Sequence, residues 1–274
     1  MENKLRQLQL CELEILDEFV RICEKHRLQY YLVGGTLLGA VRHQGFIPWD
    51  DDIDVAMPRE DYDRFASICT EELAPQFFYQ TAETDPCYFL SYAKIRKNGT
   101  EIYEERFKNA KFHKGVFIDI IPLDFCRAPG SICHFLFNIL AVMNRRGEVD
   151  SGEPYTPYKE ISGKLGYAVL QLFTPEQLVK ARKKLLALSR RLSKGDFLAS
   201  YSGAYGYYRE VFPVEWFGQG TNVIFQGRQY KAPYEIELQL TQVYGDYTRL
   251  PPVTQRKGHC DLEQSRLDIL EEKL

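Results

Sequence analysis

The chain has 274 residues, of which 45% are hydrophobic and 27% charged, an ordinary composition for a globular protein. This length is sufficient for a well-buried core, either in one large domain or in a domain with a packed lobe. Its formal net charge of −3 excludes a general affinity for nucleic acid. Its seven cysteines are scattered and form no Cys-x-x-Cys pair, so they predict neither a disulfide framework nor a zinc site, and they fit a reducing cytosol.

The first predicted element is a helix over residues 5–27. Leu8, Phe19 and Ile22 recur near a 3.6-residue period and charged residues lie off that stripe, so we expect this helix to pack across the back of a sheet. The charged N-terminus does not have the form of a signal peptide, and no run of about 18 apolar residues is present. We therefore expect a cytoplasmic protein without a membrane-spanning helix.

A short buried strand is predicted next, over residues 30–33. Gly34 and Gly35 then interrupt it, and the apolar residues that follow have the pattern of a helix start, with Thr36 as the expected N-cap. A strand, two glycines and a helix N-terminus together present N–H groups and the positive end of a helix dipole. This arrangement predicts a phosphate-binding position.

Four aspartates follow within five residues, at positions 50, 51, 52 and 54. Alternate side chains of a strand share a face, so a strand here directs Asp50, Asp52 and Asp54 one way. Ile53 and Val55 then point into the core. Carboxylates so close together repel each other unless a cation lies between them, and hard oxygen ligands suit Mg²⁺ or Mn²⁺. The alternative is a solvated acidic surface, but the preceding glycine turn favours the metal site.

The sequence from residue 34 to residue 54, with its GGTLLG, RH and IPWDDDID elements, resembles the LicD family. These proteins are phosphocholine, or more broadly phosphoryl-alcohol, transferases related to the fukutin-related proteins. The resemblance implies a nucleotidyltransferase-like fold, a phosphate held by Gly35 and Thr36, and a metal bound by Asp52 and Asp54. The strand argument alone leaves Asp50 open as a further ligand. The same motif supplies further candidates for substrate binding, namely Arg42, His43 and Asp51.

Pro58 is expected to open a helix that runs to about residue 72. Strands are predicted after it, over residues 77–80, 88–95 and 100–103. Lys94 and Arg96 share one face of the second of these strands. Such a pair is more often a surface feature. LicD-like sequences have a similar Lys-x-Arg, however, which implies contact with phosphate.

Residues 115–124, with the sequence GVFIDIIPLD, predict a nearly continuous apolar strand with Asp119 in its middle. An unpaired charge there is costly, so Asp119 needs a cation or a hydrogen-bond network. One interpretation is a buried aspartate that caps a nearby loop. The preferred one, which the LicD-like pattern of this stretch supports, places Asp119 beside Asp52 and Asp54 on a neighbouring strand. Asp124 is expected to be structural.

The chain changes character over residues 130–200, which are predicted as a helical insertion. Residues 132–142 and 165–173 are apolar but too short to span a bilayer. They are predicted either as buried core helices or as helices at a membrane interface that present basic residues to lipid headgroups. Those basic residues are Arg145, Arg146, Lys159 and Lys164. A loop is predicted over residues 147–159 and a further helix over residues 174–192.

The C-terminal part predicts a hairpin, with strands at residues 223–225 and 228–231, and a helix over residues 234–244. It is similar to the corresponding part of LicD-like sequences, and Arg256 and His259 stand where those sequences also carry basic residues. A choline group would need an aromatic cage. Candidates for that cage are Tyr207, Tyr208 and Trp216.

We therefore predict an α+β fold with a mixed-sheet, nucleotidyltransferase-like (polymerase-beta-type) core flanked by helices over residues 1–129. The insertion covers residues 130–200, and residues 201–274 pack back on the core. The resemblance implies a transferase that moves phosphocholine, or a related phosphoryl-alcohol, from a donor such as CDP-choline. Its acceptor would be a hydroxyl of a lipid-linked glycan precursor, such as teichoic acid or lipopolysaccharide, at the inner face of the plasma membrane. Two Mg²⁺ or Mn²⁺ ions would be held by Asp52, Asp54 and Asp119.

Two other functions use the same residues. One is nucleotidyl transfer, in which a nucleoside monophosphate is attached to a sugar phosphate or other small acceptor and pyrophosphate is released. The other is a non-catalytic nucleotide-binding scaffold. Three carboxylates together with the Gly-Gly-Thr turn disfavour the scaffold, whereas no residue decides which phosphorus is attacked.

Overall fold

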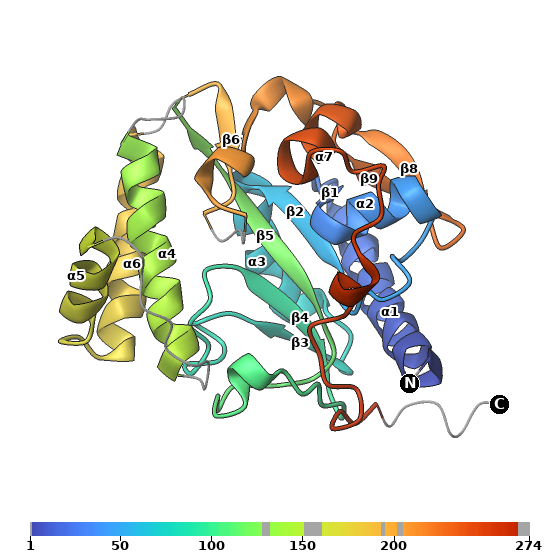
Figure 1. The fold of residues 1–274 in the computed structure, drawn as a ribbon, viewed down its shortest axis with the longest axis horizontal. Helices are drawn as coiled ribbons and strands as arrows, with labels where there is room; N and C mark the ends of the chain where they lie inside the picture. Colours follow the sequence, from blue (N-terminus) through green and yellow to red (C-terminus); the bar gives the residue numbers. More distant parts are fainter. Residues whose placement is uncertain (1, 128–131, 151–160, 193–194, 202–204, 268–274) are drawn as a thin grey trace.

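The computed structural model describes residues 2–127, 132–150, 161–192, 195–201 and 205–267. Its centre is a mixed sheet (Figure 1), whose main strands are Tyr31–Leu32 (β1), Asp54–Pro58 (β2), Phe77–Gln80 (β3), Ala93–Lys97 (β4) and Phe117–Cys126 (β5). In space these strands follow the order β1-β2-β5-β4-β3. β2 and β5 run parallel, and the other neighbours along this path pair antiparallel. The predicted mixed-sheet α+β architecture is confirmed.

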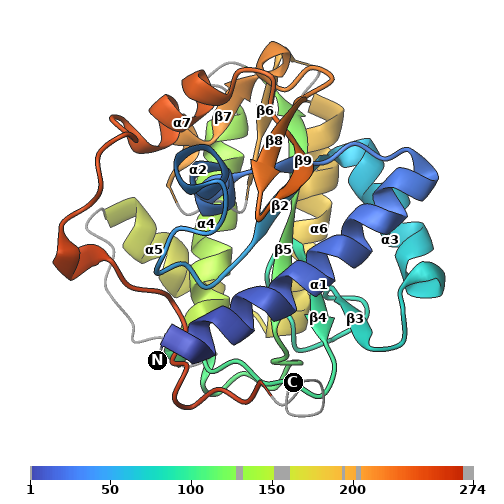
Figure 2. The same ribbon diagram turned by 90° about the vertical axis from the view of Figure 1, so that its right-hand side faces the viewer.

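Two helices cover one face of the sheet, α1 (Glu2–His26) and α3 (Arg59–Glu72). Figure 2 shows α1 running diagonally across the strands, and it contacts β4, β5 and α3. Leu16, Phe19 and Ile22 of α1 are completely buried in the main core. Their helical spacing is what places them on this one face, and the prediction that the first helix packs across the back of the sheet is confirmed.

The other face of the sheet meets segments from both ends of the chain. They include α2 (Gly34–His43) and α7 (Ile236–Tyr244), while two further strands, β6 (Phe197–Ala199) and β7 (Val211–Pro213), extend the sheet itself. β6 pairs with the distal end of β5, and β7 pairs with β6. Apolar side chains from this strand pair, α7, β1, β2 and β5 form a second core cluster. The two short strands were not predicted, because three residues are too few to show a period.

Three helices form a unit at one end of the sheet (Figure 1), and we call them the helical unit: α4 (Ile132–Asp150), α5 (Ile161–Leu170) and α6 (Pro175–Leu192). α4 contacts both α5 and α6. Phe137 and Leu140 of α4 are buried in a cluster that includes residues of α6, β5 and β7. Within the part of the chain that is described, no helix is both long and apolar enough to cross a membrane.

The C-terminal part begins with the predicted hairpin, β8 (Thr221–Phe225) and β9 (Arg228–Ala232), which packs beside α2 and β1. After α7 the chain runs along the edge of the molecule as an extended segment (red in Figure 1), with a 3-10 helix, η4 (Val253–Gln255). At its far end Arg266 forms an isolated β-bridge with Glu101. Domain boundaries at residues 129 and 200 remain a prediction.

Several predicted boundaries were wrong. The strand expected over residues 88–95 is β4, which starts at residue 93, because Tyr88 and Leu90 turn into a local cluster of apolar side chains instead of pairing. Residues 100–103 contribute only the single bridge at Glu101 within the described chain. Residues 147–150, predicted as the start of a loop, belong to α4 instead, and residues 151–159 of that predicted loop, with Lys159, lie outside the described residues.

Candidate active site

The register of the sheet places two aspartates and a lysine side by side. Asp54 of β2 is paired with Asp119 of β5 in the parallel ladder, and Asp119 is paired with Lys94 of β4 in the antiparallel ladder. Residues directly opposite each other on neighbouring strands project from the same face. The structure therefore brings Asp54 and Asp119 together from adjacent strands, as the sequence predicted.

Asp50 and Asp52 reach the same place from a loop, because β2 begins only at Asp54. The strand predicted over these aspartates is wrong, since the amide of Asp50 closes a turn by donating to the carbonyl of Ile47 at 2.9 Å. The alternation of side chains nevertheless persists. Asp50, Asp52 and Asp54 line one cavity, and Asp51 does not line it.

This cavity has a volume of about 270 Å³. It lies over the sheet face that carries Asp54 and Asp119, and parts of α2, β7 and α7 contribute to its wall. Its acidic lining residues are Asp50, Asp52, Asp54, Asp119 and Glu210. Its aromatic lining residues are Tyr92, Tyr205, Phe212, Phe217 and Tyr244. Among its described lining residues, the basic ones are Arg106 and His259.

Burial and mutual repulsion raise the pKa values of three aspartates in the cavity, and burial is the largest cause for each. The pKa of Asp50 rises to about 8, with neighbouring aspartates adding repulsion. The pKa of Asp52 rises to about 6. Asp119 adds to the rise, whereas the neighbouring His259 lowers the pKa. The pKa of Asp54 lies well above its ordinary range. Carboxyls in this state favour a bound proton or a bound cation.

The donor set fits a hard divalent cation by its chemistry. One carboxylate oxygen of Asp50 is buried and has no hydrogen-bond partner among the described residues. The carboxylate of Asp119, by contrast, accepts a hydrogen bond from the buried ammonium of Lys94. Over the described ranges, no three His, Cys, Asp or Glu side chains are arranged as a ready metal site. Metal binding by Asp52, Asp54 and Asp119, with Asp50 as a further candidate ligand and with one ion or two, therefore remains a prediction.

The glycine turn holds the N-terminus of α2 against these carboxylates. A Cβ atom added to Gly34 would lie 2.7 Å from Oδ2 of Asp54, and one added to Gly35 would lie 2.9 Å from Oδ2 of Asp50. Gly34 also has a φ of +57°, which other residues adopt at a cost. No acidic residue occupies the first turn of α2. Because Gly34 and Gly35 line the cavity, the positive end of the helix dipole faces it, and no acidic side chain of the first turn offsets it.

Thr36 has a structural position, and the prediction that it caps α2 is wrong. The helix starts two residues earlier, at Gly34, with Val33 at the N-cap position. The hydroxyl of Thr36 is buried and accepts a hydrogen bond from the amide of Asp54 at 2.8 Å. Thr36 therefore ties α2 to the start of β2, and it does not line the cavity.

Comparisons with known proteins relate this chain to one family. A family model described as LicD/FKTN/FKRP, nucleotidyltransferase domain, matches residues 27–126. The lipopolysaccharide cholinephosphotransferase LicD of Haemophilus influenzae is 31% identical over 264 residues, which cover 93% of this chain and 95% of that protein. The chain belongs to the LicD family. Ribitol 5-phosphate transferases (FKRP) of mouse and human are 44% identical over 55 residues, 19% of this chain and 11% of theirs.

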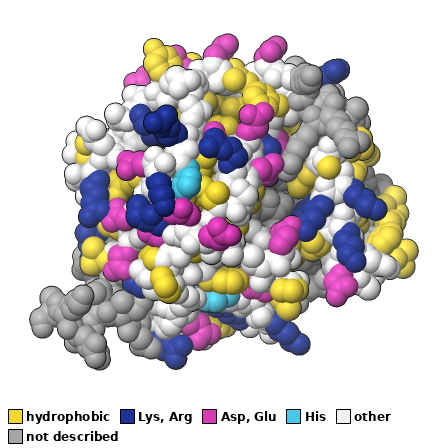
Figure 3. All heavy atoms as spheres, turned by 180° about the vertical axis from the view of Figure 1, so that it is seen from behind, with side chains coloured by type: hydrophobic (Ala, Val, Ile, Leu, Met, Phe, Trp, Pro, Cys, Tyr) yellow, Lys and Arg dark blue, Asp and Glu magenta, His cyan; other side chains and the backbone are white. Residues whose placement is uncertain are grey.

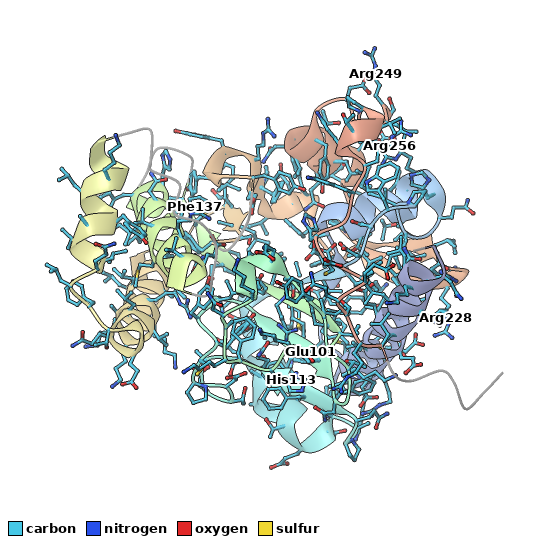
Figure 4. The ribbon with its side chains drawn as sticks, turned by 60° about the horizontal axis from the view of Figure 1, so that its bottom comes forward. Glu101, His113, Phe137, Arg228, Arg249 and Arg256 are labelled. Atoms are coloured by element: carbon cyan, nitrogen blue, oxygen red, sulfur yellow. The ribbon has the colours of Figure 1, made fainter. Side chains whose placement is uncertain are left out.

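Two candidate residues of the LicD-like motif lie at the far end of α2. Arg42 and His43 occupy its last turn, whereas the glycines at its first turn line the cavity. The guanidinium of Arg42 donates to the carbonyl of Tyr247 at 3.1 Å, which braces the C-terminal segment against α2. Neither residue lines the cavity. Figure 4 labels two further basic residues of that segment, Arg249 and Arg256, on the same side of the molecule.

The Lys-x-Arg of this LicD-family chain is buried. Lys94 has no exposed surface and Arg96 has 1% exposed, so the interpretation as a surface pair is wrong. Arg96 donates to Gln80 Oε1 at 2.5 Å and to the carbonyl of Gly115 at 2.7 Å, away from the cavity. Both cations lie over the ring of Phe117, with Lys94 Nζ 3.3 Å from its centroid. Lys94 neutralises and supports Asp119 from behind, whereas Arg96 ties β4 to Gln80 and Gly115.

The three aromatic residues proposed for a choline cage do not line the cavity. Trp216, in the 3-10 helix Val214–Trp216 (η3), packs against Phe212 with ring centroids 6.2 Å apart. Tyr207 stacks on His134 of the helical unit at 4.7 Å, and Tyr208 contacts the same ring. The aromatic wall that does line the cavity comes from separate loops and helices, and no sequence spacing marked it.

Sequence reasoning also missed two charged residues of the LicD-family cavity. Arg106, in the 3-10 helix Glu105–Phe107 (η1), donates through Nε and one Nη atom to Glu104 at 3.1 and 2.7 Å. Glu210 is 6% exposed and accepts a hydrogen bond from the amide of Tyr205, and burial raises its pKa to about 7. Both residues lie in connections without a motif, so only the fold reveals them.

Proposed function

We propose that this protein transfers phosphocholine, or a closely related phosphoryl-alcohol, from a CDP-linked donor to a hydroxyl group of a cell-surface glycan precursor. The observation that carries the proposal is a cavity in which aspartates face a glycine-lined helix N-terminus. It occurs in a chain related over nearly its whole length to a lipopolysaccharide cholinephosphotransferase. That relative's activity supports the class of donor and acceptor.

The diphosphate of the donor would lie between the aspartates and the first turn of α2. The amides of Gly34 and Gly35 and the helix dipole favour an anion there, and Arg106 and His259 add positive charge at the wall. Asp50, Asp52 and Asp54 would hold Mg²⁺. When bound, the ion neutralises charge on the donor's phosphates and lowers the pKa of an acceptor hydroxyl.

The aromatic wall would receive the alcohol. A quaternary ammonium is attracted to the faces of aromatic rings and to a nearby carboxylate. The rings of Tyr205 and Tyr244 pack edge to face with their centroids 5.3 Å apart, and the hydroxyl of Tyr205 donates a hydrogen bond to that of Tyr244 at 3.2 Å. Glu210, whose carboxylate accepts from the amide of Tyr205, lines the same cavity. These groups favour choline over an uncharged alcohol such as ribitol or glycerol.

The helical unit would bring the enzyme to a lipid-linked acceptor. Tyr167 of α5 is buried, whereas Leu165 and Val169 of the same helix are 63% and 53% exposed. Leu172, just after the helix, is 81% exposed. Figure 3, with the helical unit on the right, shows hydrophobic side chains on its outer rim beside Lys and Arg side chains. Exposed apolar side chains flanked by lysines, such as Lys164, suit an anionic membrane surface.

Membrane contact can be tested separately from catalysis. Sedimentation with vesicles of an anionic phospholipid should carry down the wild-type protein at low salt. Leu165→Glu combined with Leu172→Glu should leave it in the supernatant, whereas Leu238→Glu, at an exposed position on α7, should have no effect. If the wild-type protein stays in the supernatant at low salt, this part of the proposal is wrong.

The reaction is tested by the identity of the released product. The purified protein is incubated with Mg²⁺, a membrane extract that contains lipid-linked glycan, and CDP-choline, CDP-ethanolamine, CDP-ribitol or CDP-glycerol in turn. We expect CMP release and a phosphocholine mass increment on the glycan, with CDP-choline preferred. Pyrophosphate release from nucleoside triphosphates would establish nucleotidyl transfer instead. Nucleotide binding without either product would establish a scaffold.

A further inference from the structure

Asp51 belongs to the aspartate run but faces away from the cavity that its neighbours line. Its side chain is buried, with 2% exposed. Its carboxylate accepts hydrogen bonds from the amide of His259, at 2.7 and 2.9 Å, and from the amide of Cys260, at 2.7 Å. These donors lie more than two hundred residues away in the chain, in the extended C-terminal segment.

The C-terminal segment is shaped to accept this contact. A Cβ atom added to Gly258 would lie 2.2 Å from Oδ2 of Asp51, so only glycine lets the backbone of the segment approach the Asp51 carboxylate this closely. Two residues earlier, the guanidinium of Arg256 lies 5.3 Å from the centre of the Trp49 ring. The aspartate loop and the segment are thus joined at two adjacent points.

The contact fixes the position of a basic side chain. His259 lines the same cavity as Asp52. The residues on either side of His259 are tied down as well, because Gly258 is packed against Asp51 and Cys260 donates to it. Removing the Asp51 carboxylate would therefore free the backbone that carries the imidazole.

We propose that Asp51 is a positioning residue, which clamps residues 258–260 to the aspartate loop and so holds the imidazole of His259 against the donor's diphosphate. The identity of the donor rests on the proposed function, whereas the clamp and the contact with a diphosphate do not. Asp51 thus differs in kind from Asp50, Asp52 and Asp54, although the four stand together in the sequence.

The main test compares four single variants of the full-length protein. Asp51→Ala removes the clamp, Gly258→Ala forces it open with Asp51 intact, and His259→Gln removes only the imidazole. Asp261→Asn is the control: Asp261 also accepts backbone hydrogen bonds in this segment, but it is exposed and its acceptor contacts are local. Hydrogen exchange reports the amides of residues 258–260. Isothermal titration with inorganic pyrophosphate and Mg²⁺ reports diphosphate affinity without turnover.

We expect Asp51→Ala and Gly258→Ala to speed exchange across residues 258–260 and to weaken pyrophosphate binding about 10- to 100-fold, the range for residues that support a binding group. His259→Gln should weaken binding equally and leave exchange unchanged. The double variant Asp51→Ala/His259→Gln should bind pyrophosphate no more weakly than the weaker-binding of the two single variants, because both changes remove the same interaction. If CDP-choline is a substrate, the same variants should raise its KM more than they lower kcat.

Three results would overturn the proposal: unchanged exchange in Asp51→Ala, full pyrophosphate affinity despite faster exchange, or additive losses in the double variant. Asp51→Asn, which keeps one acceptor oxygen, should lie between wild type and Asp51→Ala. A failure of the proposed function would appear elsewhere, as absent CMP release by the wild type, and would leave the exchange and pyrophosphate results to decide the clamp.

Discussion

Two aspartate-to-asparagine changes on the paired strands β2 and β5 should have opposite effects on stability. Asp124 is 2% exposed, and its two oxygens accept hydrogen bonds from Arg59 at 2.8 and 2.7 Å. This pair fastens the start of α3 to β5, and it bears out the structural position expected for Asp124. Asp54, on the neighbouring strand, is instead half-buried beside carboxylates that repel it.

The magnitude follows from what each change leaves behind. Removing one partner of a buried ion pair costs about 3–5 kcal/mol, because the other charge stays buried. Asn at position 124 retains one acceptor for Arg59, so we expect a loss near the lower end, about 3 kcal/mol. At roughly 2–4 °C per kcal/mol for a chain of this size, Tm should fall by about 6–12 °C. Asp54→Asn removes a charge that burial and repulsion oppose, so stability should hold or rise.

The assay is urea unfolding at pH 7.5 with EDTA, followed by circular dichroism, beside the transferase assay with Mg²⁺. We expect Asp124→Asn to unfold at lower urea and to keep turnover when folded. Asp54→Asn should unfold at the same or higher urea and lose nearly all turnover. If Asp54→Asn loses as much stability as Asp124→Asn, the reasoning that Asp54 is held for function, at a cost to the fold, is refuted.

Three further predictions concern single residues. Arg106→Gln should lower kcat/KM about 100-fold, because the side chain lines the cavity, and should also lower Tm, because Glu104 is 5% exposed and loses its charged partner. Lys108→Gln, at an exposed ion pair nearby, should change neither. Thr36→Val should lower the unfolding free energy by about 1–3 kcal/mol in urea titrations, because the amide of Asp54 loses its acceptor. For Glu210, whose folded pKa is raised from 4.5 to about 7, stability is present below pH 4.5 and lost as pH rises through 7. Glu210→Gln should therefore flatten the pH dependence of unfolding over this window, by up to about 3 kcal/mol, and an unchanged slope would contradict the shift.

Local patterns predicted which acidic side chains lie together in the structure. Alternation of side chains depends on neighbouring residues, so it placed Asp50, Asp52 and Asp54 on one side although the strand begins only at Asp54. A single carboxylate within an apolar strand marked Asp119 because burial of a charge is costly wherever the strand lies. The two glycines predicted a phosphate-binding position, which stays a prediction, and in the structure the carboxylates of Asp54 and Asp50 lie against them.

The remaining parts of the site depend on contacts that no local pattern encodes. Lys94 and Arg96 share a face of β4, but they have different buried partners. Lys94 donates to Asp119, whereas Arg96 donates to the carbonyl of Gly115. Arg106 and His259 reach the cavity from loops placed by the tertiary fold. The aromatic wall is assembled from distant segments in the same way, so composition could count aromatic residues but not select them.

The central claim is that the aspartate cavity carries out a metal-dependent transfer from a CDP-linked donor. The most direct measurement is CMP release from CDP-choline, with Mg²⁺ and the glycan acceptor, by the wild type and by Asp52→Asn. We predict that the wild type releases CMP and loses this activity with EDTA. Asp52→Asn should be folded and at least about 10³-fold slower. Undiminished CMP release by Asp52→Asn would contradict the account.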